Sequence, residues 1–166
     1  MTSLRRSAAL AAVLFLIDAF VMNQGFIALM AMLGVVFVRL PSALLAWKDK
    51  ALLRNRAARA GIYAGMSVLS AAAILLNNLH AKRQAERIVL ACRRYQEKNH
   101  RFPDALEELV PDFLPSVPRA KYTTPPWDRF RYHLMPGGKH WLEYTALPPF
   151  GRPYYVFEDG RWGYLD

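Results

Sequence analysis

Two long stretches without a charged residue are the strongest constraint that this sequence places on its fold. No Asp, Glu, Lys or Arg occurs from Ala19 to Val38 or from Ala60 to Ala81. Each stretch is as long as a membrane-spanning helix, which needs about 20 mainly apolar residues. No later part of the chain has a comparable stretch. The first half of the sequence therefore predicts a membrane anchor, and the second half predicts a small polar domain.

The first 79 residues predict three membrane-spanning helices. An apolar run follows Arg5 and Arg6 and reaches Val38, with a polar interruption at Asn23-Gln24-Gly25. One helix over the whole run would be about 48 Å long, which exceeds a hydrocarbon core of about 30 Å. We therefore predict two short helices in this run and a third after the basic loop that follows it. The predicted spans are about residues 8–22, 26–47 and 60–79.

The first apolar run has alternative interpretations. A signal peptide is one, but no small-residue cleavage site follows the run and a second apolar segment comes at once. Seven basic residues lie at the N-terminus and in the 48–59 loop, against five just after His80, which favours a cytoplasmic N-terminus. Three spans then predict a membrane protein whose C-terminal domain lies outside the cytoplasm. If the first run held one span only, that domain would be cytoplasmic.

The net charge of +9 is concentrated beside the predicted spans. Up to His80 the sequence holds eight Lys and Arg against two acids, and beyond it fourteen against eleven. Basic residues beside spans set topology or attract anionic lipids, whereas a nucleic-acid-binding domain carries a basic patch of its own. We therefore expect membrane lipids and a protein as partners, and no nucleic acid.

Two charged residues fall within the predicted spans. Asp18 lies inside the first span, and Arg39 lies inside or at the end of the second. An ionisable residue at membrane depth is by default a candidate for a functional role. The alternative is that Asp18 lies near the outer end of a short helix and that Arg39 extends its guanidinium to the inner interface.

The second half, residues 80–166, opens with a predicted amphipathic helix over residues 80–99. Its apolar positions recur at spacings of four and three and form one stripe: Ala81, Ala85, Ile88, Cys92 and Tyr95. Cys92 is the only cysteine, so the chain forms no internal disulfide, and its place on the stripe predicts a core residue. Asp104 and Glu107 then predict an acidic capping box for a short helix over residues 104–110, with Glu107 and Glu108 on its solvated face.

The remainder predicts a small antiparallel sheet that packs on the helix. Apolar and polar residues alternate with period two, and turn residues separate the runs. The predicted strands are about residues 129–135, 140–146, 153–157 and 161–165. The fold class expected from the whole sequence is a membrane α anchor of three helices joined to an α+β domain.

One side of the first predicted strand is a candidate binding face. Arg129, Arg131 and His133 alternate with apolar residues and lie close in sequence to Trp127 and Trp141. Basic and aromatic side chains together suit an acidic protein partner or lipid headgroups. The alternative is an ordinary solvated strand face.

Several segments of the second half resemble the major pseudopilins of type II secretion. They are YQEKNHRFP (residues 95–103), LEELV (106–110), LPSVP (114–118), PWDRFRY (126–132) and PGGKH (136–140). Their order is similar to the end of the long helix, the loop and the first hairpin in that family, over about residues 85–145. The resemblance implies a pilin-like domain, with a long helix packed on a small antiparallel sheet.

The sequence departs from that family where the family's function is concerned. A pseudopilin has one N-terminal apolar helix that is cleaved after Gly and carries Glu five residues later, whereas here Gly61 is followed at that distance by Met66. Asp128 replaces the family's Gly after Pro-Trp, and no convincing counterpart of the acidic calcium loop is present. These departures favour a fixed membrane protein over a polymerising subunit.

The sequence holds no recognisable catalytic, cofactor-binding or metal-binding motif. No His pair has helical ligand spacing, and a pairing of His133 with His140 across a hairpin is the weak alternative. Glu158, Asp159 and Asp166 offer oxygen atoms, but a hairpin turn accounts for the first two better. We therefore expect no enzyme activity and no cofactor.

The function expected from these features is binding. We expect an inner-membrane protein with a pilin-like periplasmic domain that acts by protein contacts as an accessory of pilus or secretion machinery. The alternative is an envelope-anchored immunity protein or chaperone for a secreted effector.

Overall fold

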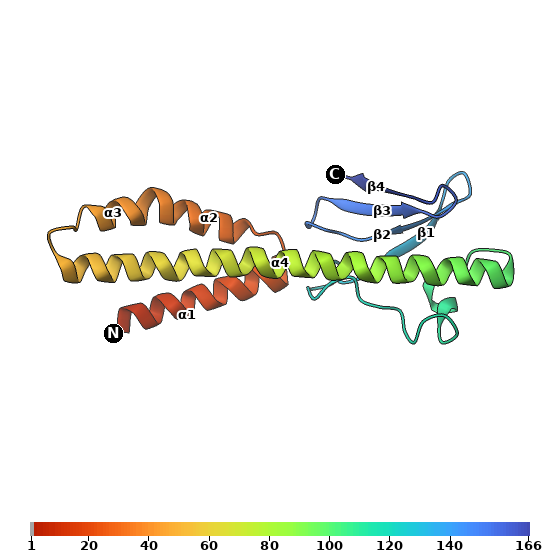
Figure 1. Cartoon of the computed structure of the whole chain (residues 1–166), viewed down its shortest axis with the longest axis horizontal. Coiled ribbons are helices and arrows are strands. Elements are labelled where there is room, and N and C mark those ends of the chain that lie inside the picture. Colours follow the sequence, from red (N-terminus) through yellow and green to blue (C-terminus); the bar gives the residue numbers. More distant parts are fainter. Residues whose placement is uncertain (1) are drawn as a thin grey trace. The chain divides into compact units, whose positions relative to one another are not determined.

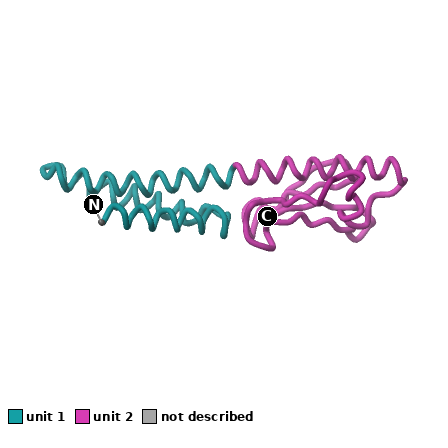
Figure 2. The backbone as a smooth tube through the Cα atoms, turned by 90° about the horizontal axis from the view of Figure 1, so that it is seen from below, with its two compact units in different colours: residues 1–75 teal, residues 76–166 magenta. Residues whose placement is uncertain are grey.

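The computed structural model describes residues 2–166 of the chain. They divide into two compact units, the first ending at Leu75 and the second running from Leu76 to Asp166 (Figure 2). Helix α4, Lys50–Asn99, contributes residues to both units.

The first unit consists of three helical segments. Helix α1 (Thr2–Leu16) continues into a π-helical turn, η1 (Ile17–Met22). After a short turn, α2 (Phe26–Gly34), a π-helical segment η2 (Val35–Arg39) and α3 (Leu40–Leu44) form a second continuous helix. The first part of α4 is the third segment (Figure 1).

Asp18 closes the turn between the first two helical segments. Asn23 and Gly25 adopt left-handed backbone conformations with φ of 53° and 75°, which short polar residues and glycine tolerate best. The Asp18 carboxylate, fully buried, accepts hydrogen bonds from the backbone N–H groups of Ile27 (3.2 Å) and Ala28 (3.0 Å). These N–H groups belong to the first turn of α2 and have no partner within that helix. Asp18 therefore acts as the N-terminal cap of the next helix.

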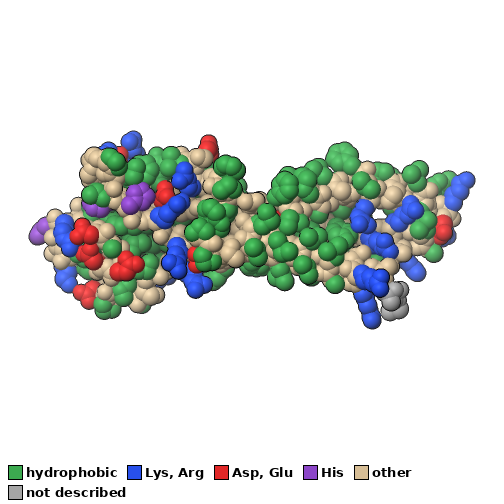
Figure 3. Space-filling model, turned by 180° about the vertical axis from the view of Figure 1, so that it is seen from behind, with side chains coloured by type: hydrophobic (Ala, Val, Ile, Leu, Met, Phe, Trp, Pro, Cys, Tyr) green, Lys and Arg blue, Asp and Glu red, His purple; other side chains and the backbone are tan. Residues whose placement is uncertain are grey.

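The first unit is packed in the opposite sense from a water-soluble domain. Small residues are buried between its helices, namely Ala11, Ala19, Ala28, Ala43, Ala60, Ser67 and Ser70. Large apolar side chains face outward, among them Leu10, Val13, Leu29, Phe37, Val68 and Leu69. The Ser67 hydroxyl donates to the Ala28 carbonyl oxygen at 2.9 Å, so that α4 and α2 meet through small side chains. Figure 3 shows the apolar surface of this unit, with Lys and Arg gathered toward one end.

Two helices of the described residues are long and apolar enough to cross a membrane, Phe26–Leu44 and Lys50–Asn99. The N-terminal segment is not among them, so the structure does not support the predicted set of three transmembrane helices. The reason lies in its length and charge, because only residues 7–22 separate Arg6 from Asn23 and Asp18 falls among them.

The second unit is an α+β fold in which a long helix packs on a four-stranded antiparallel sheet, as predicted. The strands are β1 (Arg131–Met135), β2 (Lys139–Glu143), β3 (Arg152–Val156) and β4 (Arg161–Leu165), in the spatial order β1-β2-β3-β4. Figure 1 shows the strands on one side of α4. Residues of the predicted stripe, including Ala81, Ala85 and Ile88, are fully buried in one core with Leu142 and Tyr155 of the sheet.

Strand β2 is shorter than the predicted run over residues 140–146. It ends at Glu143, and Tyr144 and Ala146 instead bond to the backbone of Pro153 (3.2 Å) and Gly151 (2.7 Å). Strand β1 begins at Arg131, two residues after the predicted start at residue 129.

The segment predicted as a capped helix over residues 104–110 is a short 3₁₀ turn, η3 (Leu106–Leu109). Its cap is Glu108, whose carboxylate accepts from the backbone N–H groups of Asp104 (2.7 Å) and Ala105 (3.3 Å). The predicted pair of Asp104 and Glu107 was therefore wrong, and so was the solvated role given to Glu108. The capping-box spacing assumes an α-helix, whereas a 3₁₀ turn presents different N–H groups.

We predict that Asp18→Ala destabilises the chain more than Asp49→Ala. Asp49 is a matched control, because it too caps a helix through two backbone N–H groups, those of Ala51 and Leu52, each at 3.0 Å, but in an exposed position. Leaving buried N–H groups unpaired costs about 1–3 kcal/mol, and losing an exposed cap costs about 1 kcal/mol. The measurement is loss of helical circular dichroism during unfolding of the full chain in detergent micelles. Equal losses for the two variants would contradict the capping role of Asp18.

Candidate functional site

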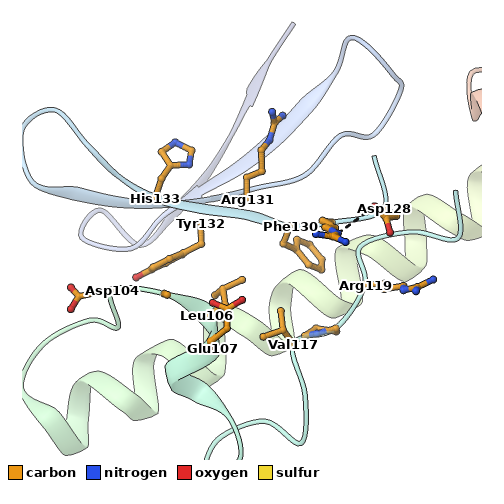
Figure 4. Close-up of a pocket in the computed structure, with 13 residues that line it drawn as sticks. Asp104, Leu106, Glu107, Val117, Arg119, Asp128, Phe130, Arg131, Tyr132 and His133 are labelled. Carbon is orange, nitrogen blue, oxygen red and sulfur yellow. Dashed lines mark ion pairs between the residues drawn. The ribbon is translucent and has the colours of Figure 1, made fainter. Parts of the chain in front are cut away.

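The strand register assigns three of the predicted binding residues, Arg131, His133 and Trp141, to the face of the sheet that points away from α4. Trp127 and Arg129 precede β1 and have no place in this register. His133 lies opposite Trp141, and Arg131 lies opposite Glu143, which in turn lies opposite Tyr154. The residues between them, Tyr132 and Leu142, belong to the core side. Figure 4 shows Arg131 and His133 on one side of β1, with Phe130 and Tyr132 on the other. We call the side that bears Arg131, His133 and Trp141 the outer face.

An aromatic stack lies at the centre of the outer face. The rings of Trp141 and Tyr154 are parallel, with an angle of 3° and centroids 4.2 Å apart. A Cβ atom on Gly163 would lie 2.2 Å from the Tyr154 ring, so only glycine lets this ring lie across β4. Beside the stack, Arg131 pairs with the nearly buried Glu143 at 2.9 Å. Contacts within the domain therefore hold the two rings in one orientation.

A hollow of about 410 Å³ opens on this face. Its lining residues are Lys139, Trp141, Tyr154, Val156, Asp159, Arg161 and Trp162. The cations Lys139 and Arg161 both pair with Asp159, at 2.8 and 3.2 Å. Two positive charges beside one negative charge leave the hollow positive. We call it the aromatic hollow.

Sequence reasoning missed Tyr154, Arg161 and the other β3 and β4 residues of this hollow. Trp141 lies in the second strand of the first hairpin, close in sequence to the predicted basic residues, whereas β3 begins 11 residues after it. The period-two alternation could have identified these residues, because Tyr154 points to the same side of the sheet as Arg152 and Val156. The Glu158-Asp159-Gly160 turn then sets the register of β4.

A second hollow, of about 680 Å³, lies along the edge of β1 that no described strand covers. One wall is the segment around η3, and the other is β1 with the residues before it (Figure 4). Arg129, Arg131 and His133 line it together with Arg119 and Asp128. We call it the edge hollow. The structure thus divides the predicted face, with Trp141 in the aromatic hollow, three residues in the edge hollow, and Trp127 lining neither.

Glu108 fixes the wall of the edge hollow. Besides its two backbone bonds, its carboxylate accepts from Arg101 Nη2 at 2.9 Å and from the hydroxyl of Tyr95 on α4. The hydrogen bond from Tyr95 is the main reason that the pKa of Glu108 is lowered to about 2, and the backbone and Arg101 donors act in the same direction. The carboxylate is therefore ionised at any physiological pH and holds η3 against α4.

Two other ionisable groups of the second unit have shifted pKa values because they are buried. Burial raises the pKa of the Cys92 thiol to about 12, so the thiol is protonated and unreactive at neutral pH. Burial also lowers the pKa of Lys121 to about 8, and its ammonium group donates to the carbonyl oxygen of Ala146. Both groups lie inside the domain rather than on the outer face.

The weak alternative of a His133–His140 pair was wrong. His133 faces Trp141, whereas His140 pairs with Leu134 and points to the opposite side of the sheet. There, His140 Nδ1 lies 2.7 Å from a Glu158 carboxylate oxygen. Within the described residues no group of three or more His, Cys, Asp or Glu side chains is arranged to hold a metal ion.

The two charged residues within the predicted spans both have partners in the first unit. Asp18 caps α2, as described above, and the Arg39 guanidinium lies 4.6 Å from the centroid of the Tyr63 ring on α4. The structure shows no contact between them among the described interactions, and a functional role for either stays a prediction.

Comparisons with known proteins leave this geometry without a named relative. No family model matches the chain, and neither a curated protein nor a solved structure matches it.

We predict that Glu108 makes the second unit sensitive to acid. Because its pKa falls from an ordinary value of 4.5 to about 2 on folding, its contribution is complete above pH 4.5 and is lost as the pH falls toward 2. Glu108→Gln removes this titration. A lost cap costs about 1 kcal/mol, or about 5 °C in Tm for a domain of this size. The Tm of each protein is measured by circular dichroism. At pH 6 the Tm of the Glu108→Gln variant should lie below that of the parent chain by this amount, and the difference between the two Tm values should be smaller at pH 2. A difference that stays constant across this range would contradict the assignment.

Proposed function

We propose that this chain is an inner-membrane-anchored protein that acts by binding another protein through the outer face of its sheet, as an accessory of pilus or secretion machinery. The proposal includes a periplasmic second unit and three membrane-crossing segments. It assigns the chain a binding role rather than a catalytic one.

The packing of the first unit supports the membrane anchor. Many of its outward side chains are large and apolar, while most of its buried ones are small, apart from Val35, Met66 and Ile74. This arrangement suits helices surrounded by lipid. The segment over α1 and η1 shares this pattern, with Leu10, Val13 and Phe20 exposed. Its one acidic residue, Asp18, is turned inward and hydrogen-bonded. These features favour a third crossing even though the segment is short.

The outer face is the single observation that carries the binding role. Aromatic rings and arginines are enriched at the centres of protein interfaces, and Trp141 and Tyr154 lie beside exposed arginines here. Arg129 and Arg161 are 78% and 76% exposed, and each also pairs with a neighbouring carboxylate, Asp128 at 3.9 Å and Asp159 at 3.2 Å. The complementary partner is an acidic protein surface that carries an apolar or aromatic side chain for the aromatic hollow.

The pilin-like interpretation rests on the resemblance of residues 85–145 and on a compatible fold. A long helix packed on a small antiparallel sheet agrees with what the resemblance implies. The same outer face would also serve an immunity protein or chaperone that recognises a secreted effector. The identity of the bound partner separates the two.

We predict opposite topology readouts from reporters fused after Asp49 and after Asp166. The two positions flank the charge-free stretch of α4, so one lies on each side of the membrane if α4 crosses it. With three crossings, alkaline phosphatase is active after Asp166 and inactive after Asp49, and a cytoplasmic fluorescent reporter shows the reverse. Phosphatase that is active after Asp49 and inactive after Asp166 would refute the crossing by the α1–η1 segment and the periplasmic position of the second unit. Identical readouts at the two positions would refute the anchor itself.

We predict that Arg129→Glu combined with Arg161→Glu abolishes capture of the partner. The change replaces one exposed positive charge in the edge hollow and one in the aromatic hollow with negative charges, and it should repel an acidic partner. The measurement is crosslinking in intact cells, followed by mass spectrometry of the captured protein.

The control for this experiment is Arg94→Glu, which makes the same change at an exposed position on α4 away from the sheet. A true partner is captured by the parent chain and by Arg94→Glu, and is lost with the double variant. Recovery of a pilus or secretion component supports the proposal, and recovery of a secreted effector supports the immunity alternative. Equal capture by all three chains would rule out the outer face as the binding surface.

A further inference from the structure

We propose that one end of the second unit, formed by the loops over residues 119–126 and 144–151, rests on the membrane surface and contacts lipid headgroups and upper acyl chains. We call it the end patch. Its exposed apolar side chains are Tyr122, Leu147 and Phe150 of the loops and Tyr164 of β4, whose hydroxyl lies beside Gly151. This inference rests on the proposed crossing of α4.

A pair of hydrogen bonds fixes the height of the end patch along α4. The Asn77 side chain accepts from the backbone N–H of Tyr122 at 2.9 Å and donates to its carbonyl oxygen at 3.3 Å. The Tyr122 ring also packs on His80, with ring centroids 5.0 Å apart. Asn77 and His80 belong to the last turns of the charge-free stretch that ends at Ala81. A helix that crosses the membrane with this stretch therefore brings Tyr122 to the interface.

A second group of contacts ties the 144–151 loop to the same end. The buried Lys121 ammonium donates to the carbonyl oxygen of Ala146. Ala146 in turn donates its N–H to Gly151 at 2.7 Å, and Leu147 pairs with Phe150 across the tip of the loop. Because Lys121 is the neighbour of Tyr122, the two loops are held together. The loop that carries Phe150 is therefore tied to the segment that Asn77 holds.

The end patch has the chemistry of a membrane interface. Phe150 is 70% exposed, Tyr122 61% and Tyr164 55%, although burying such rings would stabilise the fold. Amphipathic aromatic rings collect at the level of lipid headgroups. On α4 the first charged residues after the apolar stretch are Lys82 and Arg83, both exposed, which suits anionic headgroups at the same level.

Lipid is the occupant that these observations favour. A protein partner or a second copy of the chain would also cover apolar side chains, but neither explains why the patch is fixed at the level where the apolar stretch ends. An aromatic patch at this level meets the bilayer without any further partner.

Spin labels at matched positions test the inference on the full chain in vesicles of phosphatidylcholine and phosphatidylglycerol. The substitutions are Tyr122→Cys and Phe150→Cys in the end patch, Leu69→Cys in the apolar stretch, and Leu134→Cys at the β1–β2 hairpin. Tyr122, Leu69 and Leu134 have the same exposed fraction, 61%, so that differences between them report surroundings rather than burial. The native Cys92 is fully buried and its thiol stays protonated, so it does not compete for the label.

The readout is the collision rate of each label with oxygen, which concentrates in lipid, and with a water-soluble nickel chelate. We expect Leu69 to be accessible to oxygen and protected from nickel, Leu134 to show the reverse, and both end-patch labels to fall between them. End-patch labels that match Leu134 while Leu69 lies in lipid would overturn this inference and leave the anchor intact. A water-exposed Leu69 would instead overturn the anchor.

Dilution of the protein in lipid distinguishes whether lipid or a second copy of the protein covers the end patch. The chain is reconstituted at decreasing ratios of protein to lipid, and the collision rates at Phe150→Cys are measured again. Protection by lipid is unchanged on dilution. Protection that disappears on dilution would show that a second copy covers the patch and would overturn the proposal.

Discussion

Helix α4 buries side chains of two different kinds along one continuous run of backbone, and both units depend on how it does so. In the first unit it presents small residues such as Ala60 and Ser67, and in the second it presents the stripe that begins at Ala81. Lipid-embedded helices gain little from burying large side chains, because lipid is as apolar as leucine, so close backbone approach and hydrogen bonds hold them together. In water the same helix gains from apolar burial against a sheet. The part of this stripe that packs on the sheet begins at Ala81, immediately before charged residues return at Lys82.

The second unit was largely predictable because its signals are local. The stripe on α4 and the period-two alternation of the strands follow directly from helix and strand geometry. The errors arose where a tertiary contact determines which residue caps a helix or turn. Glu108 caps η3 because Tyr95 and Arg101 also donate to it, and neither residue lies within the spacing of a capping box. Likewise, the role of Asp18 follows from a turn that folds α2 back onto it.

The candidate binding surface was predicted only in part, for a similar reason. Arg131 and His133 share a face because they alternate in one strand, which the sequence reveals, whereas Arg129 precedes that strand. Their relation to Tyr154 and Arg161 depends on the register of three hairpins, where a slip of one residue would move every side chain to the other face. Trp127 belongs to a turn rather than a strand, where its backbone bonds to Thr124, so alternation says nothing about its direction.

Gly163 affects the shape of the aromatic hollow, because it leaves room for the ring that forms the floor of the hollow. The Tyr154 ring occupies the space where a side chain at residue 163 would stand, and Trp141 stacks on that ring. The depth of the hollow is thus set by a missing side chain on the last strand rather than by the residues that line it. Any larger residue at this position would tilt the aromatic floor and change which groups fit, without altering a single charge. In this way a residue that touches no partner would decide the shape of what is admitted.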